Sequence, residues 1–170
     1  IILGIHDGHN AGAALIKNGS VAAAIQEERL TNIKNHSGTP INAIKAVFDA
    51  AKIDPSDVSA IAIAGLTHTH VPLKERPLHV KMYERFAGLF KYHAVNSFLI
   101  SALHKRRQMC ELRSEFVKNG VNDKPIMFVE HHTAHAASTY YQRPWTDDTL
   151  VLTLDGAGDG LCSTVNIGRE

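Results

Sequence analysis

Three histidines lie close together in the segment FVEHHTAHAAS, which runs from Phe128 to Ser138. Two of them, His131 and His135, are four residues apart. On an α-helix this spacing places both imidazoles on one face, about one turn apart, as in histidine pairs that bind zinc. The alanines around the pair leave room for a ligand. The spacing favours a metal-binding pair, and the alternative is a capped helix start with exposed histidines.

A third ligand must come from another segment, because two histidines do not complete a metal site. The segment LDGAGDG offers two carboxylates, Asp155 and Asp159. Neutral imidazole combined with carboxylate suits Fe²⁺, Mn²⁺ or Zn²⁺ and selects none of them. His132 points to a different part of the helix surface and is a weaker ligand candidate. His68 and His70, two residues apart in a loop, have weak metal-binding geometry.

Glycines recur in two segments that each read as strand, turn and strand. They are Gly8 and Gly12 near the N-terminus, and Gly156, Gly158 and Gly160 near the C-terminus. The simpler interpretation is tight turns that need a positive φ. Such turns also offer backbone N–H groups to a phosphate-like oxyanion. Because one such turn lies in each of two similar strand–turn–strand segments, the pair favours a cleft that holds a phosphorylated or adenylylated ligand.

Two further polar residues accompany these motifs. His9 lies in the first glycine turn, and Lys34 lies in the polar loop that follows EERL. A lone lysine in a loop is usually solvated, so position alone gives Lys34 no role. The sequence contains no Walker A motif, no GxSxG motif and no setting for a cysteine nucleophile. These absences argue against a self-contained hydrolase.

The composition is that of a globular chain with a substantial core. Its 170 residues are 44% hydrophobic and 21% charged. A net charge of +1 argues against a surface devoted to nucleic acid. No apolar stretch approaches the ~18 residues of a membrane span. Cys110 and Cys162 match no metal-binding spacing and indicate a reducing compartment, so we expect a cytoplasmic protein.

Hydrophobic periodicity predicts an α/β fold. The dipeptide Asn18-Gly19 between the second and third strands is a strong hairpin signal. Three meandering strands followed by alternating helices and strands are typical of a ribonuclease H-like sheet with helices on both faces. We expect strands over 1–8, 11–19, 20–28, 58–65 and 124–130, helices over 41–53 and 131–142, and two helices within 78–120.

The segment 150–168 is again strand, glycine-rich turn and strand. At a shift of 148 residues, Asp7-Gly8 matches Asp155-Gly156, and Gly12 matches Gly160. A β-hairpin that opens each of two ribonuclease H-like lobes is typical of the actin/hexokinase-type ATPase superfamily. We therefore expect a first lobe over 1–143 and, over 144–170, the opening hairpin of an incomplete second lobe.

Together, three motifs resemble the carbamoyltransferase family, which includes nodulation-protein and cephalosporin O-carbamoyltransferases. The motifs are ILGIHDGHNAGAALIKNGSVAAAIQEERLTNIK, FVEHHTAHAAS and LTLDGAGDG. The middle of the chain, roughly 66–123, contains no matching motif. The family usually has His-Asp where this sequence has His9-Asn10. The combination of motifs is specific, although each motif alone is common.

The resemblance implies a metal-binding actin-like domain that transfers a carbamoyl group to the hydroxyl of a small-molecule acceptor. His131, His135 and Asp155 match the family's metal ligands, and a further aspartate is implied downstream. A YrdC-like domain, also implied downstream, would make carbamoyl-adenylate from carbamoyl phosphate and ATP. His9 and Lys34 match family positions that line the carbamoyl and nucleotide site. The 170 residues alone are expected to be inactive.

The implied chemistry suits these residue types. A divalent metal polarises the carbamoyl carbonyl or lowers the pKa of the accepting hydroxyl. The Lys34 cation would stabilise the phosphate leaving group, and His9 would accept the hydroxyl proton. Two alternatives stay open: an enzyme like the threonylcarbamoyl-tRNA synthesis protein, and a non-catalytic actin-type nucleotide-binding module.

Overall fold

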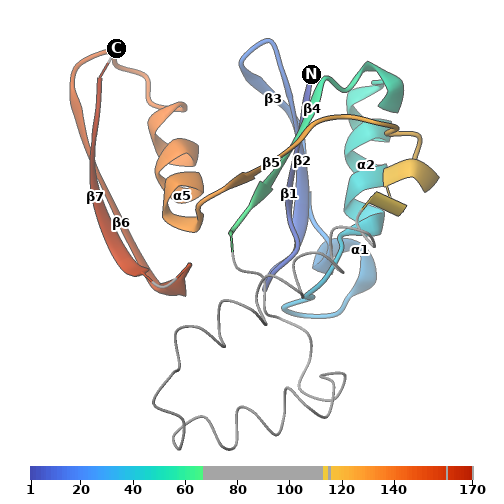
Figure 1. Cartoon of the computed structure of the whole chain (residues 1–170), viewed down its shortest axis with the longest axis horizontal. Helices are drawn as coiled ribbons and strands as arrows, with labels where there is room; N and C mark the ends of the chain where they lie inside the picture. The colour runs from blue at the N-terminus through green and yellow to red at the C-terminus, as the bar shows by residue number, and fades with distance from the viewer. Residues whose placement is uncertain (67–112, 115, 160, 170) are drawn as a thin grey trace, which may run out of the picture.

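The computed structural model describes residues 1–66, 113–114, 116–159 and 161–169 (Figure 1). The two helices predicted within 78–120 lie mostly outside these residues, and the described end of that segment is helical at 113–114 and 116–118. His68, His70 and Gly160 also lie outside them. Among the described residues, no helix is both long and apolar enough to cross a bilayer.

A five-stranded mixed sheet forms the centre of the fold, in the order β3-β2-β1-β4-β5. The first three strands form an antiparallel meander, whereas β1, β4 and β5 run parallel. The α/β prediction is therefore confirmed. The strands are β1 (Ile2–His6), β2 (Gly12–Lys17), β3 (Ser20–Gln26), β4 (Ala60–Ala64) and β5 (Ile126–Val129).

The predicted turn between β2 and β3 is confirmed. Asn18 and Gly19 both have positive φ, 51° and 78°, as a two-residue type I′ hairpin requires. Lys17 and Ser20 pair on either side of this turn. Asparagine and glycine tolerate the left-handed region better than other residues, which is why this dipeptide was predictive.

Helix α2 (Ile41–Ala51) covers one face of the sheet. It begins and ends within two residues of the predicted helix. The apolar residues at helical spacing are buried as the periodicity predicts: Ala43, Ile44, Val47 and Phe48. They pack against alternate residues of the strands, which point to the same face of the sheet. The buried strand residues of this core are Leu3, Ile5, Ala13, Leu15, Ile61 and Ile63.

The third strand ends earlier than predicted. It stops at Gln26, and a short helix α1 (Glu28–Thr31) follows in place of the expected strand end. Glu27 is only 2% exposed, and its carboxylate accepts hydrogen bonds from the backbone N–H groups of Asn42 and Ala43. This carboxylate turns inward to cap α2, and a 3-10 turn η1 (Pro55–Asp57) then leads from α2 to β4.

The C-terminal part of the chain forms a separate two-stranded antiparallel sheet. Its strands are β6 (Thr149–Gly158) and β7 (Leu161–Gly168), and α5 (His131–Tyr140) packs against both. Figure 1 shows α5 following directly from β5, with the hairpin β6–β7 beside it. The sequence predicted helices on both faces of the five-stranded sheet. In the described residues α2 covers one face, and α5 packs on the hairpin.

Candidate metal centre

Helix α5 begins immediately after β5 because Glu130 caps it. The Glu130 carboxylate accepts hydrogen bonds from the backbone N–H groups of His132 (2.9 Å) and Thr133 (2.6 Å) and from the Thr133 hydroxyl (2.9 Å). Burial raises the pKa of Glu130, but the N–H groups of His132 and Thr133 outweigh this effect and hold the pKa below its usual value. The cap therefore fixes His131 as the first residue of the helix.

The structure brings together His131, His135 and Asp155, the three predicted metal ligands. The His131 Nε2 atom lies 2.6 Å from Asp155 Oδ2 and 3.0 Å from His135 Nε2. His135 Nε2 lies 3.5 Å from the same Asp155 oxygen. Hydrogen bonds from the His131 side chain and from the Gly156 backbone N–H hold the pKa of Asp155 below its usual value. The three donor atoms therefore face one point, with Asp155 in its charged form.

This donor set fits a divalent cation. A metal bonded at about 2.1 Å to each ligand keeps neighbouring donor atoms about 3.0 to 3.4 Å apart in octahedral or tetrahedral geometry. The separation of 3.0 Å lies in that range, 3.5 Å lies just above it, and 2.6 Å is a hydrogen-bonding distance. The exposed fractions of the side chains are 19% for His131, 51% for His135 and 40% for Asp155, so one side of the cluster is open to solvent.

Position 158 requires glycine because a side chain there would overlap a neighbouring ring, and not because the backbone makes a turn. A Cβ atom there would fall within the imidazole ring of His131, whereas a Cβ at Gly156 would meet nothing within 4 Å. The interpretation of Gly8, Gly12, Gly156 and Gly158 as positive-φ turn residues is wrong, because none of them has a positive φ. Gly12 lies in β2, and both Gly156 and Gly158 lie in β6.

His132, the histidine whose role the sequence left open, is fully buried and faces the hairpin. Its Nε2 atom lies 3.0 Å from the Leu161 carbonyl oxygen, which can only accept, so Nε2 carries a proton. Its Nδ1 atom lies 2.8 Å from the Thr153 hydroxyl, which is itself 2.7 Å from the Thr164 hydroxyl. These bonds join α5 to both strands of the hairpin, which is a structural role.

Asp159, the other candidate carboxylate, contacts the backbone of two other segments. Its carboxylate accepts hydrogen bonds from the N–H groups of Leu66 and His131. Its oxygens are not part of the group formed by His131, His135 and Asp155. The prediction of Asp155 as the partner of the two histidines therefore agrees with the geometry.

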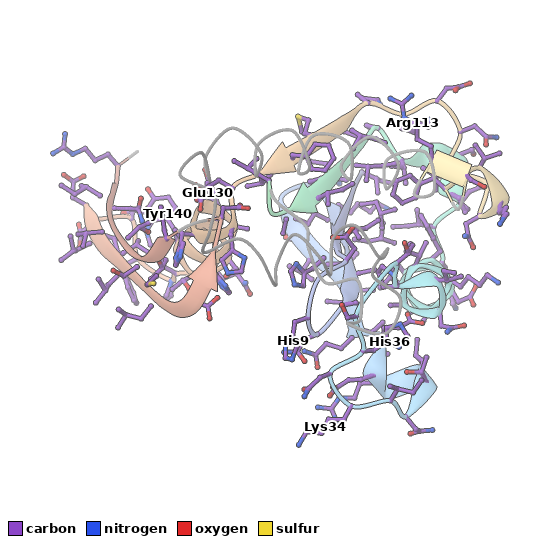
Figure 2. The ribbon with its side chains drawn as sticks, turned by 60° about the horizontal axis from the view of Figure 1, so that its bottom comes forward. His9, Lys34, His36, Arg113, Glu130 and Tyr140 are labelled. Carbon is purple, nitrogen blue, oxygen red and sulfur yellow. The ribbon has the colours of Figure 1, made fainter. Side chains whose placement is uncertain are left out.

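His9 and Lys34 are both exposed and lie apart from α5 in Figure 2, which labels them with Glu130 and Tyr140. The structure therefore does not bring Lys34 to the cluster. His6, which the sequence motifs did not single out, bonds to the backbone of His9 and lies near His131. The His6 Nε2–H donates to the His9 carbonyl oxygen (3.0 Å), and the His6 ring lies 6.5 Å from the His131 ring, centroid to centroid.

The topology explains why His6 lies near His131. It is the last residue of β1, and His131 follows β5 by two residues. Because β1, β4 and β5 are parallel, their carboxyl ends meet at one edge of the sheet, where α/β proteins place ligand sites. A hollow of about 560 Å³ lies elsewhere, at the C-terminal end of α2, and includes none of the predicted site residues.

Comparison with known proteins identifies the family. The whole chain, residues 1–170, matches the family described as Carbamoyltransferase N-terminus. The chain is 27% identical over 160 residues to the nodulation protein NolNO of Sinorhizobium fredii, a match that covers 94% of this chain and 21% of that protein.

Two further relatives carry no functional name. The chain is 31% identical over 165 residues to the uncharacterized protein sll1178 of Synechocystis sp., covering 95% of this chain and 26% of that protein. It is 26% identical over 170 residues to the uncharacterized protein MJ1051 of Methanocaldococcus jannaschii, covering 100% of this chain and 25% of that protein. The chain spans about a quarter of the length of these curated relatives. The resemblance of its histidine and glycine motifs is thus matched by similarity along its whole length, and the chain belongs to the carbamoyltransferase N-terminus family.

Proposed function

We propose that this chain is the metal-binding part of an O-carbamoyltransferase that acts on a small-molecule hydroxyl. The observation that carries the proposal is the convergence of His131, His135 and Asp155 within one small group of donor atoms, in a member of the carbamoyltransferase family. When bound there, a divalent metal (Fe, Mn or Zn) supplies Lewis-acid polarisation of the carbamoyl carbonyl or of the accepting hydroxyl.

The chain's own residues prepare the site for this chemistry. The Asp155 carboxylate lies 2.6 Å from His131 Nε2 and so keeps that ring turned towards the cluster. Gly158 leaves the space that the ring occupies, and the Glu130 cap fixes the first turn of α5. His9 is proposed to accept the proton of the attacking hydroxyl, and His6 holds the backbone of that residue through its carbonyl oxygen.

The carbamoyl donor is proposed to be carbamoyl-adenylate, made from carbamoyl phosphate and ATP by a YrdC-like domain outside this chain. The hydroxyl oxygen bonds to the carbamoyl carbon, the bond from that carbon to the phosphate oxygen breaks, and AMP leaves. Lys34 is assigned the stabilisation of the leaving phosphate. Since Lys34 lies apart from α5, this role requires the bound nucleotide to reach from the metal cluster to the loop after α1.

The fold is proposed to be the first ribonuclease H-like lobe of an actin-type domain, with β6–β7 opening the second lobe. The strand order and directions of the five-stranded sheet support the first part. The separate sheet of β6 and β7 supports the second part. One of its faces is apolar and exposed, as expected of a sheet face that further polypeptide covers. Its residues are Leu150, Leu152, Leu154, Val165 and Ile167.

The test uses the full-length gene product and a double variant, His131→Ala with His135→Ala. The variant should lose bound divalent metal in elemental analysis and lose carbamoyl transfer to a panel of hydroxyl compounds. It should retain the formation of carbamoyl-adenylate, followed as pyrophosphate release from ATP. Undiminished transfer by metal-free variant protein would refute the proposal. Transfer that requires tRNA as acceptor would support the threonylcarbamoyl-type alternative, and nucleotide binding without any transfer would support the non-catalytic module.

A further inference from the structure

We infer that Asp159 is a positioning residue that assembles the metal centre by fastening the β6–β7 hairpin to the ends of β4 and β5. Its Oδ1 and Oδ2 atoms lie 2.9 and 2.8 Å from the backbone nitrogen of Leu66, and Oδ2 lies 2.8 Å from the backbone nitrogen of His131. Leu66 follows β4, and His131 is the first residue of α5. One side chain of the hairpin therefore contacts both segments. The inference rests on the proposed function of the cluster.

The cluster needs such a connection because its ligands come from separate elements, the helix α5 and the hairpin strand β6. Asp155 belongs to β6, which pairs with β7 and is not part of the five-stranded sheet. His131 and His135 belong to the helix that follows β5. Within the described residues, no ladder of strand hydrogen bonds joins the hairpin to the five-stranded sheet. Side-chain contacts link them instead: His132 joins α5 to both hairpin strands, and Asp159, only four residues from Asp155, bonds to the start of α5 and to the segment after β4.

Asp159 acts on the same residue that Asp155 contacts. The Asp155 carboxylate contacts the ring Nε2 atom of His131, and the Asp159 carboxylate accepts a hydrogen bond from the backbone N–H of His131. Two carboxylates of one hairpin therefore hold the ring and the backbone of a single ligand. Movement of the hairpin away from α5 would break both contacts together, so the Asp159 bonds keep Asp155 in place.

The chemistry of the position suits a carboxylate. The backbone nitrogen of His131 is one of the N–H groups that the first turn of a helix leaves without a helical partner, and the helix dipole favours an anion there. Glu130 accepts from the next two N–H groups, those of His132 and Thr133. Asp159 has φ 51°, a left-handed conformation that aspartate and asparagine adopt more readily than other non-glycine residues. Asp159→Asn is therefore the variant that preserves the backbone.

The experiment compares Asp159→Asn with Asp147→Asn in the full-length protein. Asp147 is an exposed aspartate just before β6, so its variant makes the same chemical change outside the cluster. Affinity for Zn²⁺ and Mn²⁺ is measured by competition with a chelating dye. Amide hydrogen exchange at Leu66 and His131 is measured on metal-free protein. We expect Asp159→Asn to bind metal about 10- to 100-fold more weakly. We also expect faster exchange at both amides and no change in Asp147→Asn.

Two outcomes would overturn the inference. One is wild-type metal affinity and wild-type exchange in Asp159→Asn. The other is loss of metal affinity with unchanged exchange at Leu66 and His131, which would make Asp159 a ligand and not a positioning residue. Asp159→Glu, which keeps the charge but lengthens the side chain, provides a second variant if the asparagine protein does not fold. The exchange measurement needs no metal. It therefore tests the Asp159 hydrogen bonds to Leu66 and His131 even if the double histidine variant shows that the cluster binds no metal.

Discussion

The backbone of Gly158 lies against the imidazole ring of His131, so closely that a methyl group at that position would overlap the ring. The two residues lie on different elements, β6 and α5. Their contact sets how near the hairpin comes to the first turn of the helix, and therefore how near Asp155 comes to the histidines.

Gly158→Ala should weaken metal binding by at least about 10-fold, because either the His131 ring or β6 must move to admit the methyl group. Gly156→Ala is the matched control. It lies two residues away in the same strand, and its Cβ would meet nothing within 4 Å. The measurement is a chelator competition on both variants. Equal affinities in the two proteins would show that the contact does not control the cluster.

His132→Ala should destabilise the metal-free protein by about 2–4 kcal/mol, because it removes the buried hydrogen bonds of the ring to the Leu161 carbonyl and the Thr153 hydroxyl and opens a cavity. His135→Ala should change stability far less, since that side chain is 51% exposed. Denaturant unfolding in the presence of EDTA measures both. Similar losses in the two variants would contradict the structural role of His132.

Glu27→Ala should cost about 2–3 kcal/mol of stability, because three donors at the start of α2 lose their acceptor. These donors are the backbone N–H groups of Asn42 and Ala43 and the Asn42 side-chain amide. Glu28→Ala is the control, and its cost should stay below about 1 kcal/mol, because Glu28 accepts one bond from the Asn35 N–H at an exposed position. Denaturant midpoints compare the two, and an equal shift would argue against the buried cap.

Asp54 should titrate below its usual pKa of 3.8, because the Ser56 hydroxyl and then the Ser56 backbone N–H stabilise its charged form. Carbon-detected NMR of the Asp54 carboxyl measures this directly. Ser56→Ala should raise the pKa, since it removes the larger of the two causes. Because the folded pKa is depressed, the capping of η1 contributes stability above pH 3.8, and this contribution is lost as the pH falls through the folded value. An unchanged pKa in Ser56→Ala would contradict this assignment.

The elements that depend on local chemistry were predictable from the sequence. Asn18-Gly19 gave the turn between β2 and β3, and the apolar segment before Glu130 gave β5 followed at once by α5. The spacing of His131 and His135 predicted their shared face, the LDGAGDG motif offered Asp155 and Asp159 as carboxylates, and the resemblance to the carbamoyltransferase family singled out Asp155. The turn, the strand-to-helix junction and the histidine pair each depend on residues close together in the sequence, whereas Asp155 lies 24 residues from His131.

What was missed depends on residues distant in the sequence. Glu27 looked like a continuation of β3, but the cap that it provides is visible only once α2 packs on the sheet. His6 reaches the neighbourhood of His131 because parallel strands end at one edge. Gly158 was interpreted as a turn residue because glycine so often supplies a positive φ, whereas here it supplies space for a ring on another element.

The outward face of the β6–β7 hairpin has a practical consequence. Five apolar side chains on this face are each more than half exposed, on a ribbon that has two strands within the described residues: Leu150, Leu152, Leu154, Val165 and Ile167. Although α5 packs on the other face, a two-stranded ribbon with an exposed apolar face is prone to association, because its edges can pair with those of another molecule. Residues 1–170 should therefore aggregate as their concentration rises, and replacing Leu152 and Val165 with threonine should keep the protein in solution.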